Sequence, residues 1–153
     1  MKIENLRFLC FLFAEAPTNI VVQRIGDNTM RGEVVAAAGE DLELECISTG
    51  ANPAPILKWY MITRAGQMEE VPGARHSQEN TRPSPEARTW TSISRLNLPV
   101  SKEDNGAKIK CLAEHEALTA PLDSITDLTI HCELNLKDIK KTSILEQFDT
   151  KKG

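Results

Sequence analysis

The stretch SRLNLPVSKEDNGAKIKC, residues 94–111, decides the fold of this 153-residue chain. Its first half alternates apolar residues such as Leu96 and Leu98 with polar ones, and its second half alternates lysines with Ile109 and Cys111. Successive side chains of a strand point to opposite faces, so each half predicts a strand with one buried and one exposed face. The Asp-Asn-Gly tripeptide between the halves predicts a tight turn.

The same period of two recurs along the middle of the chain, at residues 43–48, 58–61 and 128–130. Turn signals separate these runs, at residues 38–41, 52–55, 72–73 and 104–106. Many short alternating strands divided by frequent turns are typical of an all-β antiparallel sandwich. The polar stretch 77–86, which contains two prolines, is expected to be an exposed loop.

Two cysteines and one tryptophan stand in the order Cys46, Trp59, Cys111. This order is typical of the immunoglobulin sandwich, in which the two cysteines lie on facing sheets and the tryptophan packs beside them. The resemblance implies a Cys46–Cys111 disulfide between the sheets. Two buried free thiols in a cytosolic domain are the alternative, and the residues alone leave it open.

The resemblance extends further than the cysteines. Residues 94–111 resemble the corresponding region of immunoglobulin-superfamily adhesion domains, with Ile109 in place of the usual corner tyrosine. This variant is similar to the constant-like second domains of nectin-like (synaptic) cell adhesion molecules and their nephrin-type relatives. Further similar segments lie at residues 17–20, 39–46, 52–59 and 111–115. The resemblance covers about residues 17–131, and Trp59, Leu98 and Ile109 are its expected core residues.

The two ends differ from the middle. Residues 1–16 combine early basic residues, a short apolar run and an Ala-Glu-Ala sequence, which predicts a signal peptide cleaved after Ala16. A buried strand or a truncated upstream exon is the alternative. Residues 17–132 then form the domain. Residues 133–153 are expected to be a charged tail of low order, with a weak amphipathic helix as the alternative.

Cys132 has no expected partner if Cys10 leaves with the signal peptide. An odd cysteine in a secreted chain indicates an intermolecular disulfide or an exposed reactive thiol. A third interpretation is that the chain is an isoform or fragment whose domain pattern breaks at this point.

Composition and motifs argue against several functions. The formal net charge of −4 disfavours a partner that is a nucleic acid or an anionic membrane. His76, His115 and His131 share no catalytic or metal-binding motif, so we expect no enzyme activity, no cofactor and no metal site. The chain contains no run of eighteen apolar residues, so its sequence predicts no membrane-spanning helix.

The resemblance implies a non-enzymatic extracellular recognition module that takes part in homophilic or heterophilic cell–cell adhesion, as a spacer or through lateral contacts. Its expected partners are cell-surface proteins of the immunoglobulin superfamily, and a homodimer is one expected form. The chain would be secreted or part of a cell-surface protein. The alternatives are a soluble ligand or decoy that modulates a receptor, and a domain of a cytosolic muscle-type array.

Overall fold

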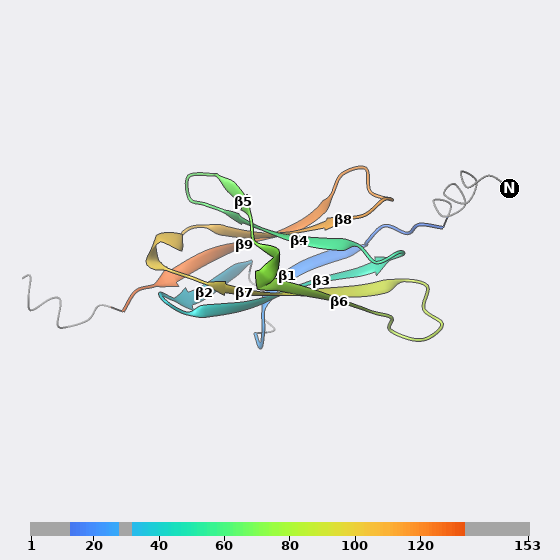
Figure 1. Ribbon diagram of the computed structural model, residues 1–153, viewed down its shortest axis with the longest axis horizontal. Coiled ribbons are helices and arrows are strands. Elements are labelled where there is room, and N and C mark those ends of the chain that lie inside the picture. The colour runs from blue at the N-terminus through green and yellow to red at the C-terminus, as the bar shows by residue number, and fades with distance from the viewer. Residues whose placement is uncertain (1–12, 28–31, 134–153) are drawn as a thin grey trace, which may run out of the picture.

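Two sheets packed face to face make up the protein (Figure 1). The computed structural model describes residues 13–27 and 32–133. One sheet has four strands, in the spatial order β1 (Asn19–Arg24), β3 (Asp41–Ala51), β7 (Trp90–Pro99) and β6 (His76–Thr81). The other has five, in the order β2 (Glu33–Ala37), β9 (Leu122–His131), β8 (Lys108–Glu114), β4 (Ile56–Ile62) and β5 (Met68–Glu70).

All strand pairs are antiparallel except β2 with β9, which run parallel. Two short 3-10 helices interrupt the loops, at Gly73–Arg75 and Lys102–Asp104. The predicted immunoglobulin-like β-sandwich is therefore confirmed, including its inter-sheet disulfide. In the part of the chain that is described, no helix is both long and apolar enough to cross a membrane.

Alternation along the strands builds the core, as the sequence pattern predicts. Strand β8 buries Ile109, Cys111 and Ala113 and turns its lysines outward. Strand β7 does the same with Leu96 and Leu98. The buried aliphatic side chains of both sheets meet around Trp59 in one hydrophobic cluster.

The loop predicted at residues 77–86 is only partly correct. His76–Thr81 is an edge strand, β6, whose backbone pairs with β7 from His76 opposite Leu96 to Thr81 opposite Thr91. Its residues are polar and nearly all exposed, so they show no apolar alternation. Backbone pairing at a sheet edge needs no buried side chains, and sequence periodicity does not report it.

The turn before β8 is held by polar side chains. Asp104 accepts hydrogen bonds at Oδ2 from the Ser101 backbone N–H at 2.7 Å and from the Ser101 hydroxyl at 2.8 Å. Gly106 then adopts φ +81°, a conformation that favours glycine. Asn105 Oδ1 accepts the Ile130 backbone N–H at 2.9 Å and so ties the turn to β9. These bonds fix the corner in the absence of the usual tyrosine hydroxyl.

The predicted signal peptide lies mostly outside the described residues, since only 13–16 of it are described. Glu15 forms an isolated antiparallel bridge with Asn52, through N–H···O bonds of 2.7 and 2.8 Å. Glu15 is thus tied to the residue that directly follows β3. The predicted tail lies outside the described residues apart from Glu133.

Candidate recognition surface

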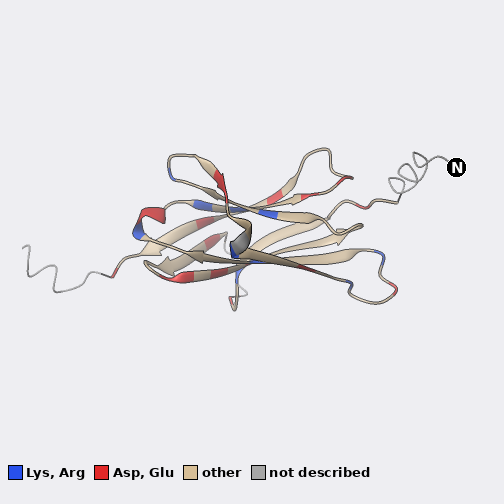
Figure 2. Cartoon of the chain, in the orientation of Figure 1, with Lys and Arg blue, Asp and Glu red and all other residues tan. Residues whose placement is uncertain are grey.

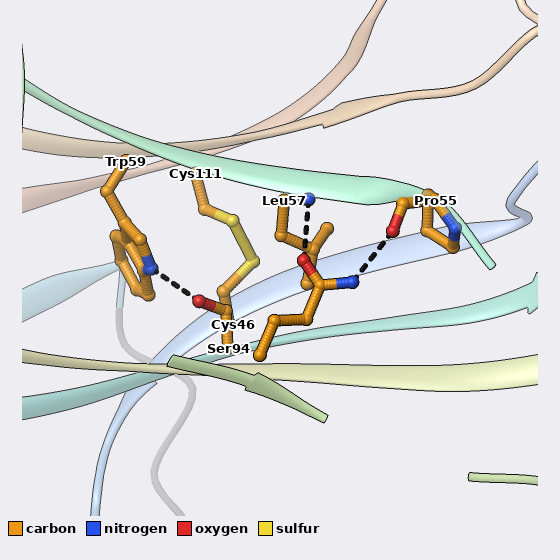
Figure 3. The surroundings of a disulfide bond; sticks show 7 residues. Cys46, Pro55, Leu57, Trp59, Ser94 and Cys111 are labelled. Atoms are coloured by element: carbon orange, nitrogen blue, oxygen red, sulfur yellow. Dashed lines mark hydrogen bonds between the residues drawn. A yellow bond between two sulfur atoms is a disulfide. The ribbon is translucent and has the colours of Figure 1, made fainter. Parts of the chain in front are cut away.

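A disulfide fixes the two sheets to each other. Cys46 lies on β3 and Cys111 on β8, with their Cα atoms 6.3 Å apart and both residues fully buried. Trp59, on β4 beside β8, packs its ring next to the bond (Figure 3). The two sheets therefore form a rigid support. Such a support holds the side chains of the outer faces in fixed positions, as a binding site needs.

Two polar side chains that the sequence analysis did not select also connect the sheets. Trp59 Nε1 donates to the Ser94 hydroxyl on β7 at 2.9 Å, and both residues are buried. Gln78 on β6 accepts the Leu57 N–H at 2.9 Å and donates to the Pro55 carbonyl at 2.8 Å. The alternation of β7 places Ser94 on its inward face, so its burial could be predicted from the sequence. Gln78 lies in the stretch that was predicted to be a loop, so its contacts could not.

The predicted site residues separate into two groups. Trp59, Leu98 and Ile109 lie together in the core cluster, with the disulfide cysteines. Cys132 lies apart from them, just beyond the end of β9, as an exposed free thiol. Its intermolecular disulfide stays a prediction.

The histidines are dispersed. His115 Nε2 lies 2.9 Å from the Pro53 carbonyl, and Nδ1 accepts the Ala117 N–H at 3.1 Å. This pattern places the proton on Nε2, so the ring ties together two turns at one end of the sandwich. His76 begins β6 and His131 ends β9. Across residues 13–27 and 32–133, no group of three or more His, Cys, Asp or Glu residues could hold a metal ion.

The outer surface of the five-stranded sheet, here called the front face, carries a ladder of ion pairs. Its three lysines lie on the central strands β4 and β8 and pair with acidic residues: Lys58 with Glu114 at 3.0 Å, Lys110 with Asp123 at 2.7 Å, and Lys108 with Asp127. The hydrogen bond with Glu114 raises the pKa of Lys58. Figure 2 shows acidic and basic segments interspersed along these strands.

Exposed apolar side chains concentrate on the same face. Among the described residues, six large hydrophobic side chains are exposed, and four of them point outward from this sheet: Val35, Ile56, Met68 and Ile125. The other two, Phe13 and Ile25, lie outside the strands. Val35 and Met68 lie on the two edge strands, β2 and β5, and the ion pairs lie between them, so this face offers a partner both apolar and charged side chains.

The outer face of the four-stranded sheet differs. Its apolar row crosses the sheet through Val21, Ile47 and Ile93, all of which are half-buried. Beside that row, Arg95 contacts Glu79 at 3.1 Å and Glu45 at 3.9 Å. Among the described residues, one exposed large hydrophobic side chain, Ile25, lies at this face, beside Glu43 and Arg95. The front face is therefore the better candidate for protein binding.

Comparison with known proteins gives one family match and several relatives. Residues 26–122 match the profile of the CD80-like C2-set immunoglobulin domain. Mouse "Cell adhesion molecule 1" is 28% identical over 124 residues, which cover 77% of this chain and 25% of that protein. Human "Cell adhesion molecule 4" is 31% identical over 83 residues, which cover 54% and 19%. The chain thus spans a quarter or less of the length of these relatives.

Solved structures share the fold. The "Rst D1-D2" crystal structure superposes with a TM-score of 0.60 at 23% identity, covering 75% of this chain and 49% of that one. The full ectodomain (Ig1–Ig3) of mouse nectin-like molecule 4 gives a TM-score of 0.57 at 23% identity, covering 78% and 35%. The resemblance to nectin-like adhesion molecules that the sequence indicated is confirmed.

Proposed function

Because the chain belongs to the CD80-like C2-set immunoglobulin domain family, we propose that it is a non-enzymatic extracellular recognition module that binds cell-surface proteins. Its partners would be other immunoglobulin-superfamily members. The role is adhesion, in which the domain serves as a spacer or a lateral contact. The relatives named cell adhesion molecules support this proposal.

The observation that carries the proposal is the rigid sandwich whose front face combines exposed apolar side chains with ion pairs. The fully buried disulfide and Trp59 hold the two sheets in a fixed position relative to each other. Most of the exposed large apolar side chains of the described residues lie on the outer face of the five-stranded sheet. A preorganised face of this kind loses little conformational entropy when a partner binds.

The disulfide also supports the extracellular location. Structural disulfides persist in oxidising compartments and are rare in reducing ones. We therefore expect the chain to pass through the secretory pathway.

A bead-aggregation assay tests the proposal. Beads coated with the full chain are mixed with beads coated with the same chain, or with the ectodomain of mouse cell adhesion molecule 1 or human cell adhesion molecule 4. We expect clusters in at least one mixture. The control is the same chain reduced and alkylated, which removes the disulfide and should abolish specific clustering.

Absence of clusters in every mixture, with the coated chain shown to be folded by its intact disulfide mass, would overturn the proposal. Clusters with the same chain alone would indicate homophilic contacts. Clusters with the other ectodomains alone would indicate heterophilic contacts.

A further inference from the structure

We infer that the hydroxyl of Ser84, in the loop between β6 and β7, is a phosphorylation site for an acidophilic protein kinase of the secretory pathway. The inference rests on the extracellular location in the proposed function and adds a modification site to it. The loop spans residues 82–89 and projects from one end of the sandwich (Figure 1).

Three serines of the chain have a glutamate two residues later: Ser77, Ser84 and Ser101. Protein kinases select acceptors by the pattern of charges around the hydroxyl. A glutamate at the second position after the serine is the pattern that acidophilic kinases recognise. The sequence therefore offers three candidates, and the structure separates them.

Two of these serines are held by the fold. Ser77 lies within β6, where its backbone pairs opposite Arg95. Ser101 donates its hydroxyl to Asp104 Oδ2 at 2.8 Å, and its N–H bonds the same oxygen at 2.7 Å. Because a kinase holds the acceptor segment in its own cleft, it would have to separate a strand or open this turn to reach either hydroxyl.

Ser84 has neither restraint. It is exposed, lies outside every strand and begins a β-turn in which its carbonyl accepts the Ala87 N–H at 3.1 Å. Pro83 and Pro85 flank it, and proline has no N–H with which to join a strand. In the part of the chain that is described, the Ser84 hydroxyl has no hydrogen bond and the exposed Glu86 has no ion pair.

Arginines on both sides of the turn suit a phosphate. The Arg82 guanidinium lies 4.4 Å from the centroid of the Trp90 ring, and Arg88 Nη2 lies 3.1 Å from Glu15 Oε1. The turn brings the Cα atoms of Ser84 and Ala87 within about 7 Å of each other, and Arg88 follows directly. A phosphate beside such guanidinium groups gains charge-assisted hydrogen bonds.

The modification is an ordinary phosphoryl transfer. Ser84 Oγ attacks the γ-phosphorus of ATP, the bond to the β-phosphate oxygen breaks, ADP leaves, and the hydroxyl proton passes to the base of the kinase. The phosphate adds about −1.5 to −2 charges. Glu15 and the turn at residues 52–55 lie at the same end of the sandwich (Figure 1). Phosphorylation therefore changes the charge of this end and leaves the front face unaltered.

The test begins with the full chain purified from the medium of secreting mammalian cells. Peptide mass spectrometry should find phosphate on Ser84 that a phosphatase removes. The phosphatase-treated chain is then incubated with a detergent-opened Golgi fraction and [γ-32P]ATP, and it should be labelled at Ser84. Glu86→Gln should lower the labelling at least about tenfold, because it removes the charge that the kinase recognises.

Three serine variants locate the site. Ser84→Ala should abolish the label, whereas Ser77→Ala and Ser101→Ala should keep the parent level. An intact disulfide mass shows that each variant is folded. Labelling that survives Ser84→Ala or is unchanged by Glu86→Gln would overturn the inference. So would a glycan in place of phosphate on Ser84, or a chain left unlabelled by a fraction that labels casein.

Secretion separates this inference from the proposed function. If the chain reaches the medium with its disulfide intact and neither cells nor the Golgi fraction phosphorylate Ser84, the inference fails and the proposed function stands. If the chain stays in the cytosol with Cys46 and Cys111 reduced, both fail.

Discussion

Trp59 Nε1 donates a hydrogen bond to the Ser94 hydroxyl oxygen, 2.9 Å away, across the interior of the sandwich. Trp59 belongs to β4 in one sheet and Ser94 to β7 in the other. Both are completely buried, so no water can replace either partner. This contact therefore fixes the orientation of the ring beside the disulfide as well as satisfying its only polar atom.

Ser94→Ala tests the contact. The substitution leaves the indole N–H unpaired in the core, and we expect the free energy of unfolding to fall by about 1–3 kcal/mol. Urea unfolding followed by tryptophan fluorescence measures the change.

Ser92→Ala is the matched control, two residues away on the same strand and equally buried. The Ser92 hydroxyl has no hydrogen-bond partner among the described residues. Removal of an unpaired buried hydroxyl should leave stability within about 0.5 kcal/mol or raise it. Equal losses from the two variants would show that the Trp59–Ser94 bond contributes nothing measurable.

Gly50 offers a second prediction. It lies at the irregularity where the β3–β7 register shifts, with φ +84°. A Cβ at this position would lie 2.5 Å from Thr18 Oγ1. Gly50→Ala combines strain and overlap, and we expect it to lower the free energy of unfolding by about 1–3 kcal/mol.

Gly73→Ala provides the comparison for Gly50. Its added Cβ would meet nothing within 4 Å, and its φ is not positive. Thermal unfolding of the two alanine variants should give a clearly lower midpoint for Gly50→Ala alone. Similar midpoints would mean that the positive φ is not required.

How far the sequence determines this fold depends on which faces are buried. Strands β3, β7 and β8 were predictable because burial of one face forces apolar residues onto every second position, as in Leu96 and Leu98. Strand β6 lies at an edge with both faces polar, and it formed through backbone bonds to β7 that leave no periodic signal. For the same reason Gln78 was missed, although it binds the backbone of both Pro55 and Leu57.

The front face shows a similar limit. Alternation predicts that Lys108 and Lys110 point outward, but which acidic residue lies beside each one depends on the register between β8 and β9. Register between distant strands is a tertiary property that a single sequence does not display. The disulfide is the exception, because the family pattern of cysteines and tryptophan specifies a long-range contact directly.

The N-terminal residues 13–16 give the third prediction. A chain that begins at Pro17 lacks the two backbone hydrogen bonds between Glu15 and Asn52 and the 3.1 Å ion pair between Glu15 and Arg88. It also lacks the exposed hydrogen bond of 3.3 Å from Asn52 Nδ2 to the Phe13 carbonyl. We expect it to be about 1–2 kcal/mol less stable than a chain that begins at Phe13, because these hydrogen bonds are lost.

Arg88→Gln in the chain that begins at Phe13 separates the two contributions. It removes only an exposed ion pair, so its effect should stay below about 1 kcal/mol. Equal stability of the two truncated chains would show that the bridge adds nothing, and would make cleavage after Ala16 costless to the fold. N-terminal sequencing of the protein from secreting cells identifies which end exists.

The disulfide carries the last prediction. It joins residues 65 positions apart, and closure of a loop of that length is worth about 4 kcal/mol in the chain-entropy estimate. A domain of this kind has a total stability of only about 5–15 kcal/mol, so the loss would be a large share of it.

The double variant Cys46→Ala/Cys111→Ala avoids mispairing with Cys132, and its denaturant midpoint should fall strongly or the chain should fail to be secreted. Cys132→Ser removes an exposed free thiol and should change stability by less than about 0.5 kcal/mol. A double variant within about 1 kcal/mol of the parent would mean that the packing around Trp59 holds the two sheets together without the disulfide.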